Sequence, residues 1–597
     1  MPAIPSWLLE PLWDQFAALL PGRPVSEFGV LFVAGFGEQR PGTAIASFAS
    51  ALYRWLFRWN ASGTRRSASP PTLSQTALSS AGGGPAHATL AVPMPLTSGE
   101  REARWQLAES SWADLFTPPR FLGVARWIWK VSTCLLVLQF VIPMRRHWQR
   151  AKRIDKSWHR RLADRLVAVC YLGLMAIAAT ASVLLSLALA LLEKLPIPRI
   201  DEAVRWVAVK VSAVLGDSYM LAHCPVQFAA MRTQVARDLR WLQDRCEKVA
   251  VVAHSQGAAI AHQVLKDGGD HRGNIRAFIT VGQGISKLHL LWRMDWDPHA
   301  YRAAWWSRLL VTTGMFFAGL PALGLLARHW TSATIVQILV SLPVSVLLPC
   351  AGFVIIVIGV VVAMHAVCGD LQQDLALADA GLWWSDYYAS ADPVSNGPLV
   401  TESSQTPGDD QAAPGQAWLL PGSCHQVYNS ASLLFDHNRY LRNQDQLLSR
   451  LVNDLAAAAY GDSPTGPKVV SEADLIKVGH RRHRLVLLLI AARILSVGLV
   501  AELWWVNLGP LLKDPMNRLV DLLSPHTQMG EGFARFLAAI LITAVIYTAA
   551  VIGWRIRERY VIRRFFHTAQ RAGDAGQQGP HEPAGQAVKE EVPASVG

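Results

Sequence analysis

Hydrophobic positions fall into two kinds of run along the chain: short runs bounded by turn residues, and much longer apolar stretches. The short runs rich in β-branched and aromatic residues are typical of strands. They are Phe28–Val33, Ala88–Val92, Arg104–Ala108, Val249–Val252, Ala277–Val281 and Leu382–Ala389. Apolar residues at helical spacing predict helices at 7–20, 43–58 and 225–246. Strands that alternate with helices predict an α/β fold with a mostly parallel sheet.

Three stretches lack any such periodicity. Residues 60–86 are rich in Ser, Gly, Pro and Thr, and residues 401–418 in Pro, Gly and Asp, so both are predicted to be loops. Beyond about Thr568 the chain is a low-complexity mixture of Gly, Gln, Glu and Ala. We expect that tail to be disordered, because it holds too little apolar surface to bury.

About six long apolar stretches approach the length of about 20 residues that a membrane helix needs. They are 124–143, 166–192, 309–327, 334–364, 485–508 and 533–554. Tryptophans stand at the ends of two of them, as in the aromatic belt of a membrane protein. These are Trp127, Trp129, Trp305 and Trp306. The first stretch is marginal in length, and a buried core helix is its alternative.

Composition supports the membrane interpretation. The 597 residues are 51% hydrophobic and carry a formal net charge of +12. The Lys and Arg residues cluster beside apolar runs, as membrane anchors do, which disfavours nucleic acid as the partner. The seven cysteines are scattered, without disulfide or zinc spacing, so we expect a reducing compartment and no metal. The N-terminus lacks the basic region of a secretory signal peptide.

The stretch with the clearest chemistry is VAVVAHSQGAAIAHQVL, residues 249–265. It predicts a strand, a sharp turn and a helix, with Ser255 at the apex. The turn matches the G-x-S-x-G nucleophile elbow, except that Ala253 replaces the first glycine. Such a turn exposes the serine hydroxyl beside the N–H groups of the helix N-terminus. The alternative is an ordinary turn with a capping serine.

A serine hydroxyl needs a base in hydrogen-bond reach and a carboxylate that orients the base. In one known arrangement these three residues follow along the chain in the order Ser, acid, His. After Ser255, the segment LWWSDYYASADPVSNG offers Asp386 and Asp392 as the acid. We favour Asp392, which follows the predicted strand and precedes Pro393. Asp386 lies within the strand and is interpreted as a structural partner.

For the base, we favour His437, which follows an apolar run in SASLLFDHNRYLRN. His425 and His365 are its rivals, although His365 lies at the end of an apolar stretch and is interpreted as interfacial. His254 precedes the serine, points away from it at such a turn, and is interpreted as a packed histidine. The neighbouring Asp436 is interpreted as a cap or a solvated charge.

These residues carry a resemblance. The segments VLFVAGFGEQRPGT, AESSWAD, VAVVAHSQGA, FITVGQG, YYASADPVSNG and LLFDHNRYLRN resemble a bacterial membrane-embedded α/β-hydrolase with lipase-like motifs. The resemblance implies a serine hydrolase without a cofactor, with Ser255, His437 and Asp392 as the catalytic triad. The backbone N–H groups of Phe36 and Gln256 would bind the oxyanion. One departure is that Ala34-Gly35 stands where such hydrolases usually have His-Gly.

The expected fold is therefore an α/β-hydrolase-like, mostly parallel sheet interrupted by transmembrane hairpins. Because the apolar stretches come in pairs, each hairpin returns the chain to one side, and all site segments can meet there. The hydrolase parts are 1–123, 193–305 and 365–480, the hairpins are 124–192, 306–364 and 481–555, and the basic, then disordered, tail is 556–597.

The expected activity is cleavage of an ester or acyl bond, with membrane lipid or another acylated molecule as the partner. The alternative from another class is a non-catalytic membrane scaffold or sensor that uses the same fold. A transporter is disfavoured, because ionisable residues such as Glu502 are few well inside the spans. The sequence carries no signal for substrate identity or oligomeric state.

The signals for sidedness conflict. The loop Arg145–Arg165 holds nine Lys and Arg residues against two Asp, which by the positive-inside rule places it in the cytoplasm. More basic residues in total lie on the other side, and no signal peptide leads residues 1–123 across. We therefore expect a multi-pass protein of the bacterial inner membrane whose termini and catalytic domain are cytoplasmic.

Overall fold

The computed structural model describes most of the predicted α/β domain and four long helices. The described residues are 26–35, 40–61, 70–78, 84–96, 99–112, 220–267, 273–327, 342–367, 382–389, 423–430, 436–461, 466–505 and 531–577, with shorter pieces within 115–171, 375–378, 392–399 and 418–419 and residue 518. The predicted helix at 7–20, Phe36, and most of the first two apolar stretches lie outside them.

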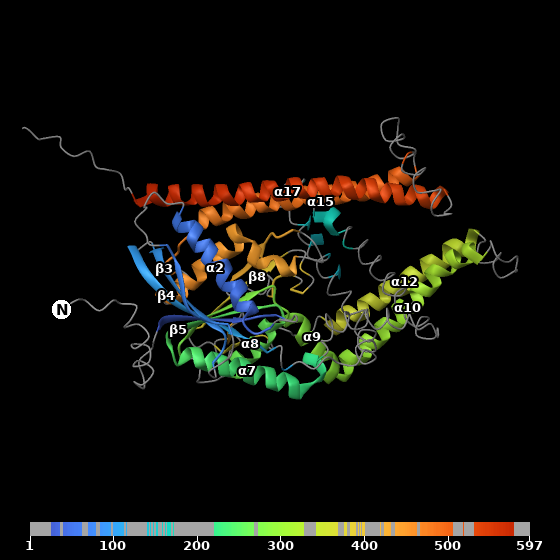
Figure 1. Cartoon of the computed structure of the whole chain (residues 1–597). Coiled ribbons are helices and arrows are strands. Elements are labelled where there is room, and N and C mark those ends of the chain that lie inside the picture. Colours follow the sequence, from blue (N-terminus) through green and yellow to red (C-terminus); the bar gives the residue numbers. More distant parts are fainter. Residues whose placement is uncertain are drawn as a thin grey trace, which may run out of the picture.

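An eight-stranded sheet forms the centre of the molecule (Figure 1). Its strands are β1 (Ser26–Val33), β2 (Thr72–Ala77), β3 (His87–Leu96), β4 (Gly99–Ser110), β5 (Cys246–His254), β6 (Ile275–Val281), β8 (Trp383–Ala389) and β10 (Ser423–Val427). Their order is β10-β8-β6-β5-β1-β4-β3-β2. Every neighbouring pair is parallel except the two pairs that include β3. The prediction of an α/β fold with a mostly parallel sheet is confirmed.

The central strands β1 and β5 are buried on both faces. The side chains of 28–34 and 249–253 are at most 8% exposed. A parallel strand covered on both faces is apolar at successive positions, which is why both strands were visible as continuous apolar runs. Since β5 lies between β1 and β6, the carboxyl ends of these three strands meet at one edge of the sheet.

Helices cover the two faces of the sheet (Figure 1). One core cluster joins the sheet to α2 (Thr43–Ala61) and α14 (Ser449–Tyr460), and the other joins it to α7 (Pro225–Gln243), α8 (Gln256–Asp267) and α9 (Ile285–Trp296). The result is a three-layer α/β/α arrangement, the usual way for a parallel sheet to bury both faces.

Several elements differ from the sequence prediction. β2 lies within the predicted loop 60–86, and β10 has no counterpart in the prediction. The predicted loop 401–418 ends in a short strand, β9 (Trp418–Leu419), which pairs with β7 (Leu377–Ala378) in a second, two-stranded sheet. The helix α17 (Glu531–Gln577) continues past residue 555 into the tail that was expected to be disordered from about Thr568.

Two described helices are long and apolar enough to cross a membrane, rather than the about six that were expected. The candidate spans are Val346–Ala363 of α12 (Leu342–Val367) and Ala538–Phe566 of α17, and 17% and 11% of the residues in their most apolar parts are buried. Because a core helix of a soluble protein is mostly buried, their exposure is unlike that of a core helix. α10 (Pro298–Ala327) and α15 (Glu472–Trp505) are helical where spans were expected, but many side chains of their apolar segments lie outside the described set.

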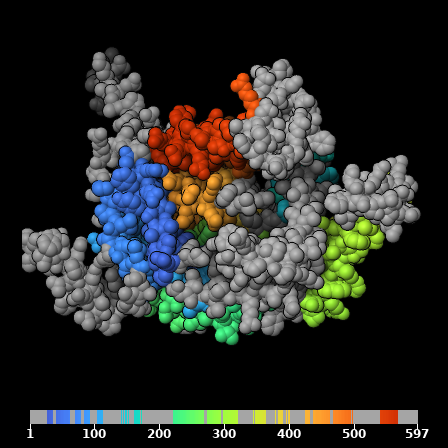
Figure 2. Space-filling model, turned by 45° about the vertical axis from the view of Figure 1, so that its right-hand side comes forward, coloured from blue at the N-terminus to red at the C-terminus, as the bar shows by residue number. Residues whose placement is uncertain are grey.

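α10 and α12 form a hairpin that extends away from the sheet (Figures 1 and 2). The two helices touch through glycines: a Cβ on Gly314 would lie 2.5 Å from the carbonyl oxygen of Gly352. The large apolar side chains point outward instead, with Phe316, Leu347 and Phe353 each at least 59% exposed. Small residues between the helices and large apolar residues outside are typical of membrane helices.

Candidate active site

Ser255 stands at the turn between the central strand β5 and helix α8. Its φ of 58° is the only positive φ of a non-glycine residue in the described part of the chain. This left-handed conformation costs on the order of 1–3 kcal/mol and persists only where the surroundings enforce it. Two bonds to the end of β6 and to the turn after it do so: the Ser255 N–H donates to the carbonyl of Val281 (3.2 Å), and the Ser255 carbonyl accepts from the N–H of Gly284 (2.9 Å).

The turn after β1 packs directly against this elbow. A Cβ on Gly35 would lie 2.3 Å from the Cβ of Ser255, and a Cβ on Gly257 would lie 2.3 Å from the carbonyl oxygen of Ala34. Trp112 donates its indole N–H to that same carbonyl (3.1 Å). Only glycine fits at 35 and 257, because any side chain would displace backbone. The two turns therefore face each other at the carboxyl edge of the sheet.

His437 lies within hydrogen-bond distance of the serine. It begins the short 3₁₀ helix η5 (His437–Arg442), and its Nε2 is 2.7 Å from Oγ of Ser255. Its Nδ1 is 3.0 Å and 3.1 Å from the two carboxylate oxygens of Asp392. Since Asp392 accepts a hydrogen bond from Nδ1–H, Nε2 is the nitrogen that accepts from the serine hydroxyl. The three residues predicted from their order in the sequence are thus brought together.

Asp392 is 1% exposed and is held by several donors. Besides His437, it accepts from the Tyr440 hydroxyl (2.6 Å) and from the backbone N–H of Val394 (2.7 Å). Burial by itself raises the pKa of Asp392. The hydrogen bond and charge of His437, with the bonds from Tyr440 and Val394, outweigh burial and lower the pKa below its ordinary value. The carboxylate is therefore ionised opposite the imidazole.

The alternatives to the acid and the base lie elsewhere. Asp386 is buried inside β8, where it accepts hydrogen bonds from Thr280 Oγ1 (2.8 Å) and from the backbone N–H of Leu399 (3.2 Å). Burial raises its pKa to about 7. His425 stacks on Tyr387 with ring centroids 5.4 Å apart. His365 lies in α12, and its side chain is outside the described set.

His254 packs against the base. Its ring stacks on His437 with centroids 4.8 Å apart, and its Nε2–H donates to the backbone carbonyl of His437 (3.1 Å). Burial, reinforced by the nearby His437, lowers the pKa of His254 to about 3. The imidazole therefore stays neutral, as a packed histidine would.

Asp436, which was interpreted as a cap or a solvated charge, is neither. It is 1% exposed and makes no side-chain cap to η5. Its carboxylate accepts hydrogen bonds from the backbone N–H (2.7 Å) and the hydroxyl (2.5 Å) of Ser430.

Tyr440 is a site residue that sequence reasoning missed. Its hydroxyl donates to Asp392 and accepts from the backbone N–H of Ala389 at the end of β8 (2.8 Å). Gly282, with a φ of 58°, makes room for it: a Cβ there would lie 2.5 Å from the Tyr440 ring and 2.8 Å from Oδ2 of Asp392. The one available signal was that Tyr440 stands three residues after His437, which is one 3₁₀ turn.

Of the two expected oxyanion donors, the structure describes Gln256 but not Phe36. Gln256 begins α8 directly after Ser255, so its backbone N–H belongs to the first turn of that helix. Phe36 lies outside the described residues, although the preceding Gly35 touches the elbow.

Within the described part of the chain, no group of three or more His, Cys, Asp or Glu side chains could hold a metal ion. Comparisons with protein-family models, curated proteins and solved structures found no match to this chain.

Proposed function

We propose that this chain is a membrane-bound serine hydrolase of the α/β-hydrolase class, lipase-like in its motifs, which cleaves an ester or other acyl bond. The observation that carries the proposal is the continuous line of hydrogen bonds from Oγ of Ser255 through His437 to Asp392. A serine on a left-handed turn between the central strand and a helix is how such enzymes present their nucleophile.

The reaction follows from these contacts. As Oγ of Ser255 forms a bond to the acyl carbon, its proton passes to Nε2 of His437, and Asp392 stabilises the imidazolium that results. The tetrahedral intermediate collapses when the leaving oxygen or nitrogen takes that proton. Water then attacks the acyl-enzyme with His437 as the base, which releases the acid and restores the serine. No cofactor takes part in any step.

The developing oxyanion needs preorganised donors. We assign this role to the backbone N–H groups of Gln256 and Phe36. The packing of Gly35 on Ser255 supports the assignment, because it brings the turn after β1 beside the reacting atom. These donors come from the backbone, so replacing His-Gly with Ala34-Gly35 does not remove them.

A membrane location is the second part of the proposal. The exposed apolar faces of α12 and α17 and the glycine contacts of the α10–α12 hairpin support it. We propose about six spans in three hairpins, in the inner membrane of a bacterium, with the catalytic domain in the cytoplasm. A site at the bilayer surface favours a lipid or an acylated molecule as substrate.

A fluorophosphonate probe tests the activity, because it reacts with activated serines. The full-length protein in detergent should be labelled, Ser255→Ala should not, and Ser74→Ala, on the exposed face of β2, should react like the wild type. Equal labelling of Ser255→Ala would remove Ser255 as the nucleophile. A folded wild-type protein that never reacts would favour the non-catalytic scaffold.

Reporter fusions at the C-terminus test the sidedness. Green fluorescence is expected for a cytoplasmic end. Alkaline phosphatase activity together with a dark fluorescent fusion would put the tail, and by parity the active site, on the outside.

A further inference from the structure

A cavity of about 170 Å³ separates the turn that begins at His437 from the helix α17. Ser255, Asp392 and His437 do not line it. Its lining is dominated by arginines from three elements of the chain: Arg439 and Arg442 of η5, Arg482 of α15, and Arg555 and Arg559 of α17. A cavity can hold a single water at about 10–15 Å³, so this one has room for the four oxygens of a phosphate group.

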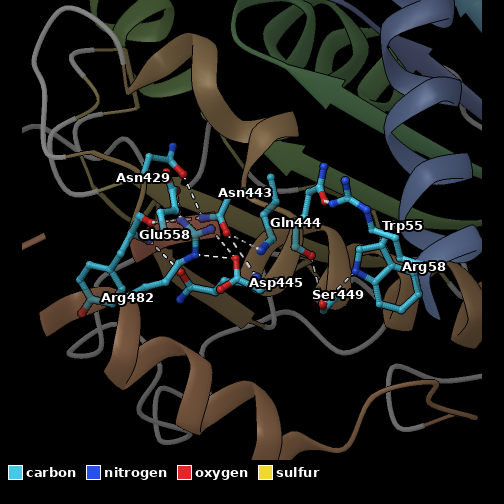
Figure 3. Close-up of polar contacts among 12 residues, drawn as sticks. Trp55, Arg58, Asn429, Asn443, Gln444, Asp445, Ser449, Arg482 and Glu558 are labelled. Atoms are coloured by element: carbon cyan, nitrogen blue, oxygen red, sulfur yellow. Dashed lines mark hydrogen bonds and ion pairs between the residues drawn. The ribbon is translucent and has the colours of Figure 1, made fainter. Parts of the chain in front are cut away.

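One of these arginines is already neutralised. Arg482 is 3% exposed, donates from Nε to Asp445 (2.6 Å) and pairs through Nη1 with Glu558 (3.0 Å) (Figure 3). Glu558 is the only acidic side chain among the described residues that line the cavity. One carboxylate that already pairs with Arg482 does not balance the charge of the other four arginines in the lining.

The remaining arginines crowd one another. Arg439 is partly buried, and burial lowers its pKa, which the nearby positive charge of Arg555 lowers further. Arg442 acts in the same direction, while Asp436 and Glu558 oppose it. Gathering like charges from two separate elements costs free energy unless an anion lies between them. The amide side chains of Asn429 and Asn443 in the same lining add polar character.

The place of the cavity along α17 suggests the source of such an anion. Trp554 and Ile562 complete the lining, and Arg555 directly follows the predicted apolar stretch 533–554, within the candidate span of α17. In a membrane helix, a tryptophan followed by arginines marks the level of the lipid headgroups. Guanidinium groups bind phosphate oxygens in pairs, and basic pockets between membrane helices bind anionic headgroups.

We propose that this cavity binds the phosphate group of an anionic phospholipid. Because Arg439 and Arg442 belong to the turn that begins at His437, the bound phosphate ties this turn to α17. The proposal rests on the membrane placement of α17 proposed above and does not depend on the activity of Ser255, so it is tested by lipid binding alone.

The test uses full-length protein in detergent and follows the thermal unfolding midpoint as phosphatidylglycerol is added, since a ligand of the folded state raises that midpoint. Arg555→Gln/Arg559→Gln removes two arginines of the cavity. Arg557→Gln/Arg563→Gln removes two exposed arginines of the same helix that do not line it. Phosphatidylcholine and inorganic phosphate are the comparison ligands, and each variant without ligand provides its own baseline.

Phosphatidylglycerol should raise the midpoint of the wild type and of the Arg557/Arg563 variant. The Arg555/Arg559 variant should bind it roughly thirtyfold more weakly. Phosphatidylcholine and inorganic phosphate should have little effect. An equal loss in the two double variants, an undiminished response of the Arg555/Arg559 variant, or an equal response to phosphatidylcholine would overturn the site. A response to inorganic phosphate that matches the response to phosphatidylglycerol would overturn the lipid as its source.

Discussion

Tyr440 donates its hydroxyl hydrogen to Oδ2 of Asp392 across 2.6 Å, from the same 3₁₀ turn whose first residue, His437, donates to that carboxylate. The Tyr440 hydroxyl also accepts from the N–H of Ala389, at the end of the strand that leads to Asp392. One phenol therefore fixes the acid relative to the base and relative to the sheet. In the proposed reaction it would act through Asp392, as a positioning residue.

Tyr440→Phe removes this bond and keeps the ring. Hydrogen bonds to charged groups contribute about 1.5–3 kcal/mol, so we expect kcat for a model ester to fall about ten- to hundredfold, with KM nearly unchanged. Steady-state kinetics measure the split. Tyr560→Phe, which alters an exposed tyrosine of α17 (62% exposed), is the control and should match the wild type. An unchanged kcat in Tyr440→Phe would show that Asp392 is held well enough without it.

The two carboxylates of the acid segment should differ sharply when each is changed to an amide. Asp392→Asn leaves His437 without its partner and favours the wrong tautomer, which costs about 10⁴ in kcat in serine proteases. Asp386→Asn should cost less than about tenfold, because Asp386 contacts Thr280 and Leu399 and lies away from the base. Kinetics on both variants decide the assignment. The reverse ranking would make Asp386 the acid of the triad.

Asp386 should instead affect stability as pH changes. Its pKa in the folded chain is about 7 against an ordinary 3.8, so between these values the folded state holds a proton that the unfolded state releases. Stability from this group is then lost as pH rises from about 4 to about 7, by on the order of a few kcal/mol. The unfolding midpoint of the wild type should therefore fall relative to Asp386→Asn across that window.

The control for this comparison is Asp244→Asn, which changes an exposed carboxylate at the end of α7. Its midpoint should run parallel to that of the wild type at every pH. A constant difference between wild type and Asp386→Asn from pH 4 to pH 7 would contradict the raised pKa.

The centre of the fold was predictable from the sequence because burial dictates its pattern. β1 and β5 are apolar at successive positions since helices cover both of their faces. β2 and β10 were not predictable, because they lie at the two edges of the sheet, where half of the backbone bonds face outward. Their sequences, TLSQTA and SCHQV, are mostly polar. A polar strand is fixed by pairing with its neighbour, and pairing leaves no periodic signal.

The candidate site was also predictable only in part. Ser255 and Asp392 follow predicted strands and His437 follows an apolar run, and these positions with the order of the three residues were enough to select them. The contacts that hold them were hidden, because each joins residues far apart in the sequence: Tyr440 and Asp392 are 48 residues apart, and Arg482 and Glu558 are 76 apart. No local pattern encodes which partner a buried polar side chain finds. The close approach of Gly35 and Ser255 is of the same kind, and it can be tested.

Gly35→Ala should impair catalysis through this contact. The added methyl would lie 2.3 Å from the Cβ of Ser255 and 3.1 Å from the carbonyl oxygen of His254, so the turn after β1 must move away from the elbow. A displacement of about 1 Å at a reacting group costs about a hundredfold in rate, and we expect kcat to fall by that factor. The rate of fluorophosphonate labelling should fall with it.

Gly273→Ala is the matched control for that change, because a Cβ at 273 meets nothing within 4 Å. It should leave the activity and the labelling unchanged. The unfolding midpoint of each variant separates a loss of folded protein from a loss of geometry. If Gly35→Ala keeps the wild-type kcat, the turn after β1 moves without consequence for the reaction, and the backbone N–H of Phe36 is not an oxyanion donor.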